Sequence, residues 1–158
     1  MFSQQTCVVS LNDTAGRQFR RVDSVLDRAI DGPTWLLERS LAECVTGMIE
    51  RGACELRQYH LHAFVVMANH VHLLITPLCS VARLTKGLKG ASARECNKIL
   101  GRTGDRFWQD ESFDHWVRTT GEFHRIRAYI EQNPVTAELV KTPCDWPWSS
   151  VTRRTALT

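Results

Sequence analysis

Residues 63–75 read AFVVMANHVHLLI, an apolar run that is interrupted near its centre by Ala-Asn and two histidines. β-Branched and aromatic residues crowd both sides of the Ala-Asn pair, which predicts two strands, residues 55–66 and 70–76, joined by a tight turn. Because successive side chains of a strand point to opposite faces, His70 and His72 project from the same face. Leaving a buried polar group unsatisfied costs about 2 kcal/mol or more. We therefore expect the two imidazoles to be hydrogen-bonded, exposed at an edge, or bound to a ligand such as one divalent metal ion.

A second histidine pair, His60 and His62, precedes the turn on the first of these strands. If the turn has two residues, residue 67 pairs with residue 70, and His60 and His62 then lie on the sheet face opposite His72. A three-residue turn would reverse this assignment. An exposed or internally satisfied position is the simpler interpretation of these two histidines, and a role beside His72 is the alternative.

Helix and strand patterns elsewhere complete the expected fold. They predict a strand at residues 5–11, a helix over 22–51 that breaks at Gly32-Pro33, a helix from an N-cap at Ser80 to about Leu100, and a strand at 113–117. Asp31 or Thr34 can cap the part of the first helix that follows its break. Thr119 and Glu122 form a capping-box pattern at the start of a last helix. That helix is predicted to end at Asn133, because a following proline disfavours the α conformation.

The element order β-α-β-β-α-β-α predicts an α+β fold of the ferredoxin-like split β-α-β type. Its antiparallel sheet would have helices on one face, with the last helix added at the C-terminal end. With 158 residues, of which 43% are hydrophobic, the chain fits one domain over residues 1–158. Residues 141–158, which contain Trp146 and Trp148, are expected to form a C-terminal tail that packs on this domain.

Composition narrows the class of protein. The six cysteines form no C-x-x-C pair, which predicts reduced thiols in the cytoplasm rather than a disulfide framework or a zinc cluster. No basic segment followed by an apolar segment opens the chain, and no apolar stretch approaches the ~20 residues that span a bilayer. We therefore expect no membrane contact.

Positive charge is concentrated in one part of the chain. The net charge is only +3, but residues 81–129 hold ten basic and six acidic residues, which leaves the remainder slightly acidic. The helix that starts after Ser80 has one apolar face and one cationic face. In the last helix Arg125, Tyr129 and Asn133 follow one another at intervals of four residues, so a cation, a phenol and an amide line one side.

Five ordered motifs now carry a resemblance to a known family. They are VVMANHVHLL at 65–74, LKG at 88–90, FWQ at 107–109 with Asp114-His115, YIEQNPV at 129–135, and DWPWSS at 145–150. Together they cover about residues 55 to 150. The chain resembles the HUH single-tyrosine transposases, and among them the REP-associated tyrosine transposases, which are similar to insertion-sequence transposases.

The resemblance implies an enzyme of bacterial cytoplasm, associated with the nucleoid, that cleaves and rejoins single-stranded DNA at hairpin or repeat ends. Tyr129 would be the nucleophile and would form a 5′-phosphotyrosine, while His70 and His72 would bind Mg²⁺ or Mn²⁺, with zinc as an alternative. Asn133 would be a further ligand. A phenol with a pKa of about 10 is only ~0.1% ionised at pH 7, so Arg125 or the metal would have to favour the phenolate.

Other interpretations of these residues stay open. Asn133 precedes a proline and can instead be the N-cap of a helix over residues 134–139. Four aromatic residues can stack on unpaired bases: Phe107, Trp108, Phe113 and Trp116. Core packing is expected for at least two of the four. The cations predicted to contact DNA are Arg83, Lys86, Lys89, Arg94 and Arg125. The first four can instead be merely solvated on their helix face.

The alternatives for function belong to two other classes. One is a domesticated DNA-binding protein or regulator that keeps the fold and has little catalysis. The other is a metal-dependent phosphodiesterase in which water attacks and Tyr129 only binds substrate. Members of the resembled family act as monomers or as dimers that share tyrosine helices, so a homodimer and attack in trans also stay open.

Overall fold

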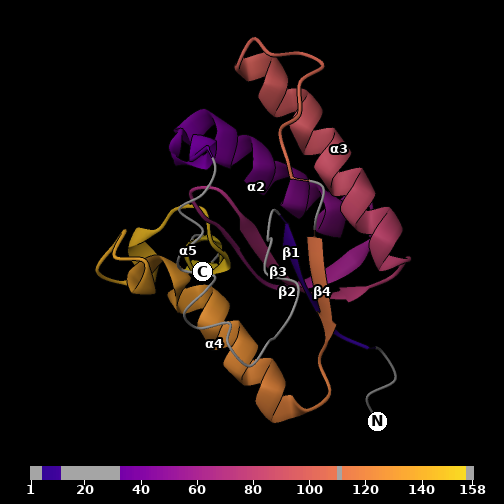
Figure 1. Ribbon diagram of the computed structural model, residues 1–158. Coiled ribbons are helices and arrows are strands. Elements are labelled where there is room, and N and C mark those ends of the chain that lie inside the picture. The colour runs from indigo at the N-terminus through magenta and orange to yellow at the C-terminus, as the bar shows by residue number, and fades with distance from the viewer. Residues whose placement is uncertain (1–4, 12–32, 110–111, 156–158) are drawn as a thin grey trace.

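A four-stranded antiparallel sheet forms the centre of the molecule. The computed structural model describes residues 5–11, 33–109 and 112–155. Strands β1 (Cys7–Leu11), β2 (Tyr59–Val66), β3 (Val71–Pro77) and β4 (Ser112–Trp116) lie in the order β2-β3-β1-β4 (Figure 1). All three neighbouring pairs are antiparallel. The sequence-based prediction of an α+β fold with a split β-α-β sheet is confirmed.

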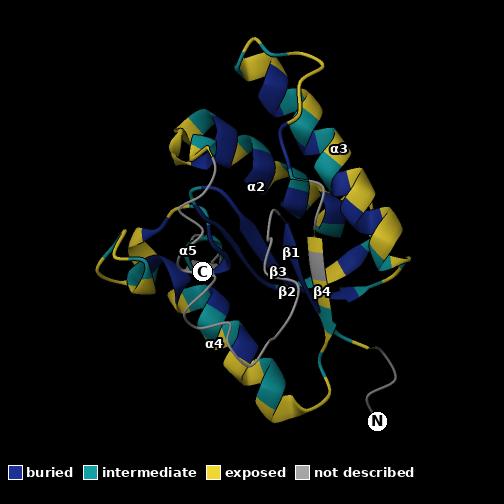
Figure 2. Cartoon of the chain, viewed as in Figure 1, coloured by how far each residue is buried: buried dark blue, intermediate teal, exposed yellow. Residues whose placement is uncertain are grey.

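Helices cover both faces of this sheet, in two separate hydrophobic layers. Helices α2 (Arg39–Cys54) and α3 (Val81–Ile99) lie on one face, and α4 (Thr120–Thr136) lies on the other (Figure 1). Alternation along the strands assigns Val9 and Leu73 to the first layer, and Val8 and Leu74 to the layer under α4. In Figure 2 the buried residues of the helices lie toward the sheet and the exposed ones lie away from it.

The C-terminal segment pairs with the outer edge of β2. The backbone N–H of Val66 donates to the carbonyl of Trp148 at 2.9 Å, and the Trp146 indole donates to the carbonyl of Val66 at 2.9 Å. The hydroxyl of Ser150, the first residue of helix α5 (Ser150–Thr155), accepts from the N–H of Phe64 at 3.1 Å. These bonds satisfy donors and acceptors that an edge strand would otherwise present to another chain.

The end of α4 differs from its prediction. The helix was expected to stop at Asn133, but it continues through Pro134 to Thr136, so the alternative that Asn133 is the N-cap of a helix over 134–139 is wrong. Proline removes one hydrogen-bond donor, yet the carbonyl of Asn133 still accepts from the N–H of Ala137 at 2.9 Å. Asn133 and Pro134 are both buried, and this packing offsets the missing bond.

Two predicted helix starts are confirmed. The Ser80 hydroxyl accepts from the N–H of Arg83 at 3.2 Å and caps α3, and the Thr119 hydroxyl accepts from the N–H of Glu122 at 3.1 Å and caps α4. Each cap satisfies a donor that has no partner inside its helix. The capping side chains thus mark the first residues of both helices, as the sequence predicts.

The start of the first helix follows its prediction less well. The stretch predicted over residues 22–51 falls partly on residues 12–32, Asp31 included, which lie outside the described residues. In the described part a single turn, η2 (Trp35–Leu37), precedes α2, and Thr34 makes no side-chain cap hydrogen bond there. The N–H of Leu36 instead donates to the carbonyl of Ala68 at 3.0 Å, which ties this turn to the β2–β3 hairpin.

The aromatic residues before β4 pack in the core. Phe107 and Trp108 are buried in the layer under α2 and α3, and the Trp108 indole donates to the Ser92 hydroxyl at 2.9 Å. The prediction that at least two of these aromatic residues pack in the core is therefore confirmed. Trp116, at the end of β4, is 41% exposed.

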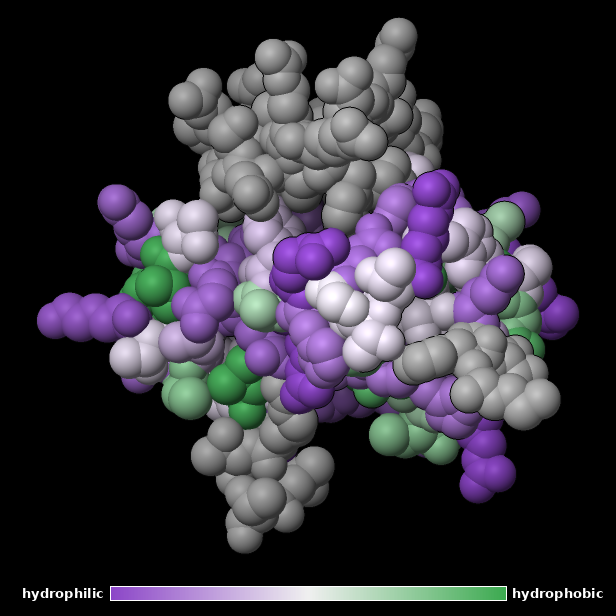
Figure 3. Space-filling view, turned by 90° about the horizontal axis from the view of Figure 1, so that it is seen from below, coloured by the Kyte–Doolittle hydropathy of each residue, from purple (hydrophilic) through white to green (hydrophobic). Residues whose placement is uncertain are grey.

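Hydrophilic residues cover most of the coloured surface in Figure 3, and the hydrophobic residues there form small separate groups. Such scattered apolar residues are normal on a protein surface. Among the described helices, none combines the length and the apolar character that crossing a membrane requires.

Replacing Gly52 by alanine should destabilise the fold. A Cβ there would lie 2.5 Å from the Tyr59 hydroxyl, which donates to the carbonyl of Ile49 at 2.6 Å. We expect Gly52→Ala to lower the free energy of unfolding by about 1–3 kcal/mol, measured by urea denaturation. Gly47→Ala is the control in the same helix, since apart from adjacent residues and the helix backbone no described atom would lie within 4 Å of its Cβ, and it should stabilise by about 1 kcal/mol. Equal effects would contradict this packing argument.

Candidate functional site

The two histidines of the β2–β3 hairpin lie together under α4. The hairpin turn has the two predicted residues, because the N–H of Met67 donates to the carbonyl of His70 at 2.9 Å. His72 is 1% exposed and His70 is 7% exposed, and their ring centroids are 4.7 Å apart. The prediction that the pair shares a face therefore leads to two adjacent buried imidazoles.

Each imidazole uses one nitrogen for a hydrogen bond and leaves the other without one. His70 Nδ1 lies 2.8 Å from Asn69 Oδ1, and His72 Nδ1 lies 2.7 Å from the hydroxyl of Ser10 on β1. Both Nε2 atoms are buried and have no hydrogen-bond partner among the described residues. A buried polar atom of this kind is rare unless a ligand satisfies it.

Burial keeps both imidazoles neutral. It lowers the pKa of His70 to about 4, because the charged form would lose its hydration. Burial and, to a smaller extent, the neighbouring His70 lower the pKa of His72 as well. A neutral imidazole presents a lone pair, which is the form that binds a metal ion.

Helix α4 places Tyr129 against the histidine pair. The rings of Tyr129 and His72 have centroids 5.9 Å apart and an interplanar angle of 64°. The hydroxyl oxygen of Tyr129 is buried although the residue as a whole is only partly so. The structure thus brings the predicted nucleophile and the predicted metal ligands together.

Asn133 follows Tyr129 by one helical turn and is only 2% exposed. Its Nδ2 is buried and has no hydrogen-bond partner among the described residues. Because residue i+4 lies on the same side of a helix, the amide follows Arg125 and Tyr129 along one side of α4. The position agrees with the expectation that Asn133 serves the site, and its role as a ligand stays a prediction.

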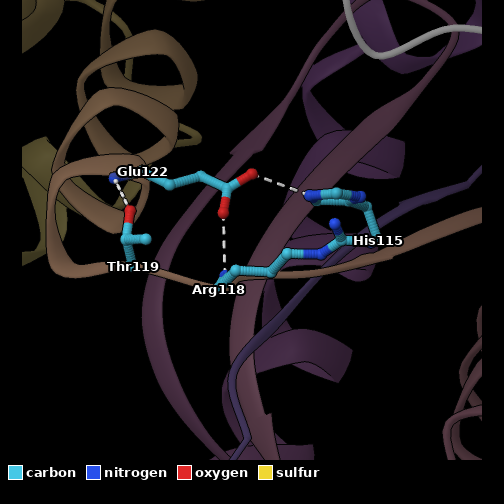
Figure 4. Close-up of polar contacts among 4 residues, drawn as sticks. All are labelled: His115, Arg118, Thr119 and Glu122. Atoms are coloured by element: carbon cyan, nitrogen blue, oxygen red, sulfur yellow. Dashed lines mark hydrogen bonds and ion pairs between the residues drawn. The ribbon is translucent and has the colours of Figure 1, made fainter.

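Glu122 fastens the start of the tyrosine helix to β4 (Figure 4). One carboxylate oxygen accepts from the N–H of Arg118 at 2.7 Å, and the other lies 2.8 Å from His115 Nε2. The Arg118 N–H and, less strongly, His115 hold the pKa of this carboxyl below its usual value, against the opposing effect of partial burial. The predicted capping box is present in altered form, because the carboxylate bonds the N–H of Arg118 rather than that of Thr119.

His60 and His62 are placed on the same face as His72, which contradicts the assignment made for a two-residue turn. The turn does have two residues, but a bulge between Leu61 and Ala63 shifts the register. The extra residue is His62. Its Nε2 lies 2.8 Å from the Thr76 hydroxyl oxygen, and its ring packs edge-on against Phe123 of α4. A bulge inserts one residue into one strand, so the faces of all residues before it are exchanged.

The five predicted DNA-contacting cations fall into two groups. Arg83, Lys86 and Arg94 are exposed on α3, whereas the Lys89 ammonium donates to the carbonyl of Gln109 at 2.5 Å. Arg125 lies on the other side of the sheet, on α4, with its guanidinium beside Gly121. The structure therefore gathers the α3 cations but does not bring Arg125 to them.

A divalent metal fits the histidine pair. The neutral imidazoles of His72 on β3 and of His70 just before it present Nε2 atoms that have no hydrogen-bond partner in the described part of the chain, and a buried amide side chain lies on the helix above. Among the described residues no group of three or more His, Cys, Asp or Glu could hold a metal ion. Protein donors here would therefore be neutral nitrogen and oxygen atoms, and substrate phosphate and water would complete the coordination.

The family model described as Transposase IS200 like matches residues 36–133. The chain belongs to this family. The matched stretch begins in η2 and ends at Asn133, so it contains the hairpin, the α3 cations and Tyr129. Family membership confirms the resemblance that the five motifs carried.

Individual relatives agree with this assignment. The chain is 30% identical over 104 residues to the REP-associated tyrosine transposase of Escherichia coli (strain K12), a match that covers 63% of this chain and 59% of that protein. The matched part thus spans about three fifths of the curated relative. The fold is similar to the solved structure of a REP-associated tyrosine transposase bound to a REP hairpin, with a TM-score of 0.62, 20% identity, and coverage of 97% of this chain and 80% of that one.

The sequence did not lead us to Ser10 and Asn69, which contact the two histidines in this member of the transposase family. Ser10 is the one polar residue in the strand CVVSL, whose five residues are all buried. A lone buried polar residue in a strand signals a partner, and the sequence carries this signal. It does not name the partner, because residues 10 and 72 meet only through strand pairing.

Replacing Glu122 by glutamine should destabilise the protein at neutral pH and leave acid stability unchanged. The folded-state pKa of Glu122 is below its unfolded value, so the carboxylate contributes stability above about pH 4 that is lost as the pH falls through the folded-state pKa. We expect Glu122→Gln to cost about 1–2 kcal/mol at pH 7, with the difference from wild type disappearing toward pH 3, by urea denaturation. Glu55→Gln, in an exposed pair with Arg51, is the control and should change stability much less. A Glu122→Gln effect that is the same at both pH values would refute this interpretation.

Proposed function

We propose that this protein is a DNA strand-cleaving and strand-joining enzyme in which Tyr129 attacks a phosphodiester of single-stranded DNA beside a divalent metal held by His70 and His72. The observation that carries the proposal is the meeting of three groups in one buried place. Two imidazole Nε2 atoms have no hydrogen-bond partner among the residues that the structure describes, and the centroid of the Tyr129 ring lies 5.9 Å from that of His72. Membership of a transposase family supports the same chemistry.

The residues present suit Mg²⁺ or Mn²⁺, and His70, His72 and Asn133 would hold the ion. When bound, a divalent ion supplies Lewis-acid stabilisation of negative charge on a non-bridging phosphate oxygen. Because the protein donors are uncharged, DNA would strengthen binding of the ion, since its phosphate adds negative charge. Affinity for the free ion should therefore be modest.

Tyr129 performs the covalent step. Its phenolic oxygen forms a bond to phosphorus while the bond from phosphorus to the 3′ oxygen breaks, so the products are a 5′-phosphotyrosine and a free 3′-OH. The phenolic proton is lost to solvent and the departing 3′ oxygen gains one. The ester keeps the phosphodiester energy, so a second 3′-OH can reverse the step and join strands without ATP.

The exposed cations of α3 are proposed to hold DNA away from the cleaved bond. Arg83, Lys86 and Arg94 face solvent, and a cavity of about 630 Å³ lies between α3, the segment before β4, and β4 itself. Lys86, Lys89 and Arg106 are among its lining residues. The relative of similar fold was solved with a REP hairpin bound, and we propose hairpin DNA as the ligand of this chain as well.

Tyr129→Phe should abolish covalent attachment to DNA. Labelled single-stranded DNA that carries hairpins is incubated with protein and Mn²⁺ or EDTA, and adducts are resolved on a denaturing gel. We expect an adduct only with wild-type protein and Mn²⁺, since phenylalanine has no nucleophile. Tyr59→Phe is a matched control, because Tyr59 is the other tyrosine of the chain and packs under α2 on the opposite sheet face. It should retain the adduct.

Two other outcomes of this assay would overturn the proposal. Cleavage without an adduct would identify water as the nucleophile, and hairpin binding without cleavage would identify a DNA-binding protein.

Mixing Tyr129→Phe with a His70→Ala, His72→Ala variant tests whether Tyr129 attacks beside the histidines of its own chain or beside those of a second copy. We expect the mixture to stay inactive, because Tyr129 lies beside His72 of its own chain. An adduct would instead show attack in trans within a homodimer.

Removing the α3 cations should weaken DNA binding in a salt-dependent way. We expect the triple variant Arg83→Ala, Lys86→Ala, Arg94→Ala to reduce the slope of log K against log salt by about 0.7 for each single-strand phosphate that the protein no longer neutralises. The measurement is fluorescence anisotropy at several salt concentrations. A triple variant of equal charge change elsewhere, Arg39→Ala, Arg51→Ala, Lys141→Ala, is the control. Equal slopes for the two variants would mean that the α3 cations are merely solvated.

A further inference from the structure

We propose that Asn69 and Ser10 are positioning residues that fix the proton of His70 and His72 on Nδ1, so that both Nε2 lone pairs face the same place. This inference rests on the proposed function, since it explains how the chain prepares a metal site. It assigns a role to two residues whose side chains lie 2.8 Å and 2.7 Å from the respective Nδ1 atoms.

The need for such residues follows from histidine chemistry. A neutral imidazole carries one proton, on either Nδ1 or Nε2, and the nitrogen with the proton cannot bind a metal. If either buried ring carried its proton on Nε2, that N–H would have no acceptor within the described ranges of the chain. The neighbouring hydrogen bond decides which tautomer is present.

Asn69 determines the tautomer of His70 directly. Its Oδ1 can only accept a hydrogen bond, so a bond of 2.8 Å to His70 Nδ1 requires the proton on Nδ1. Asn69 occupies the second position of the two-residue turn and is itself buried. The turn residue and the histidine are adjacent in sequence, so the hairpin geometry alone sets this contact.

Ser10 does the same for His72 from a different strand. Residues 10 and 72 are directly paired across β1 and β3, and the Ser10 side chain is 3% exposed. A hydroxyl can donate or accept, but a proton on Nε2 of His72 would be buried without an acceptor among the described residues. The hydroxyl is therefore the acceptor that β1 offers to Nδ1. Partners of this kind typically affect metal affinity by 10–100-fold.

The test measures ring protonation in the metal-free protein by ¹⁵N NMR of labelled histidines, in which protonated and unprotonated nitrogens have well-separated shifts. In wild-type protein we expect the proton on Nδ1 of both His70 and His72. Asn69→Leu should lose this preference at His70, and Ser10→Ala should lose it at His72. Asn69→Asp and Ser10→Thr keep an acceptor oxygen and should restore it.

Affinity for Mn²⁺ alone, measured from the electron paramagnetic resonance signal of the free ion, is the second readout. We expect Asn69→Leu and Ser10→Ala each to weaken Mn²⁺ binding by about 10–100-fold. Ser92→Ala is the matched control, since Ser92 is also fully buried and bonds Trp108 on the other sheet face. It should lower stability and leave both readouts unchanged.

Failure of this inference is distinguishable from failure of the proposed function. Wild-type protons on Nε2, or unchanged tautomers and Mn²⁺ affinity in Asn69→Leu and Ser10→Ala, would overturn the positioning role even if DNA adducts form. If wild-type protein bound no Mn²⁺ with or without DNA, the proposed metal function would fall. The tautomers, measured without metal, would still decide whether Asn69 and Ser10 fix the two rings.

Discussion

The antiparallel pairing of β1 with β3 is the constraint on which the rest of the structure depends. β1 is only five residues long, yet it lies between β3 and β4 and pairs with both. Its alternating side chains divide the interior into one layer under α2 and α3 and another under α4. The same register brings Ser10 opposite His72. Fold and site therefore share one set of backbone hydrogen bonds, and a slip of one residue would exchange every side chain between the two faces.

The layer under α4 contains buried polar side chains of the site as well as apolar ones. It holds the apolar side chains that seat the helix, but it also buries two imidazoles and an asparagine. Groups of this kind lower stability unless they gain partners, and the two imidazoles lie in the layer that also contains Tyr129. The second layer contains Tyr59, Trp108 and Ser92, whose polar atoms are all paired within the protein.

The tyrosine helix is held from both ends by contacts that have little to do with its own sequence periodicity. At its start Glu122 joins it to Arg118 and His115 of the β4 side, and at its end the buried Asn133-Pro134 pair keeps the last turn against the interior. Between these points Ile126 and Ile130 pack on the sheet. The position of the Tyr129 side chain beside His72 results from these supports together. In this respect the site is an outcome of the whole α4 interface rather than of one motif.

The sequence by itself determined the local structure. Alternation in AFVVMANHVHLLI fixed the shared face of His70 and His72, capping side chains fixed the starts of α3 and α4, and the element order fixed the split β-α-β sheet. Only the tertiary structure decided the bulge that moves His60 and His62 to the site's face, the continuation of α4 through Pro134, and the pairing of Ser10 with His72. The physical reason is the distance along the chain over which each interaction acts. Alternation and capping act within a few residues, whereas a bulge, a buried proline and a cross-strand hydrogen bond gain their stability from partners that are distant in the chain.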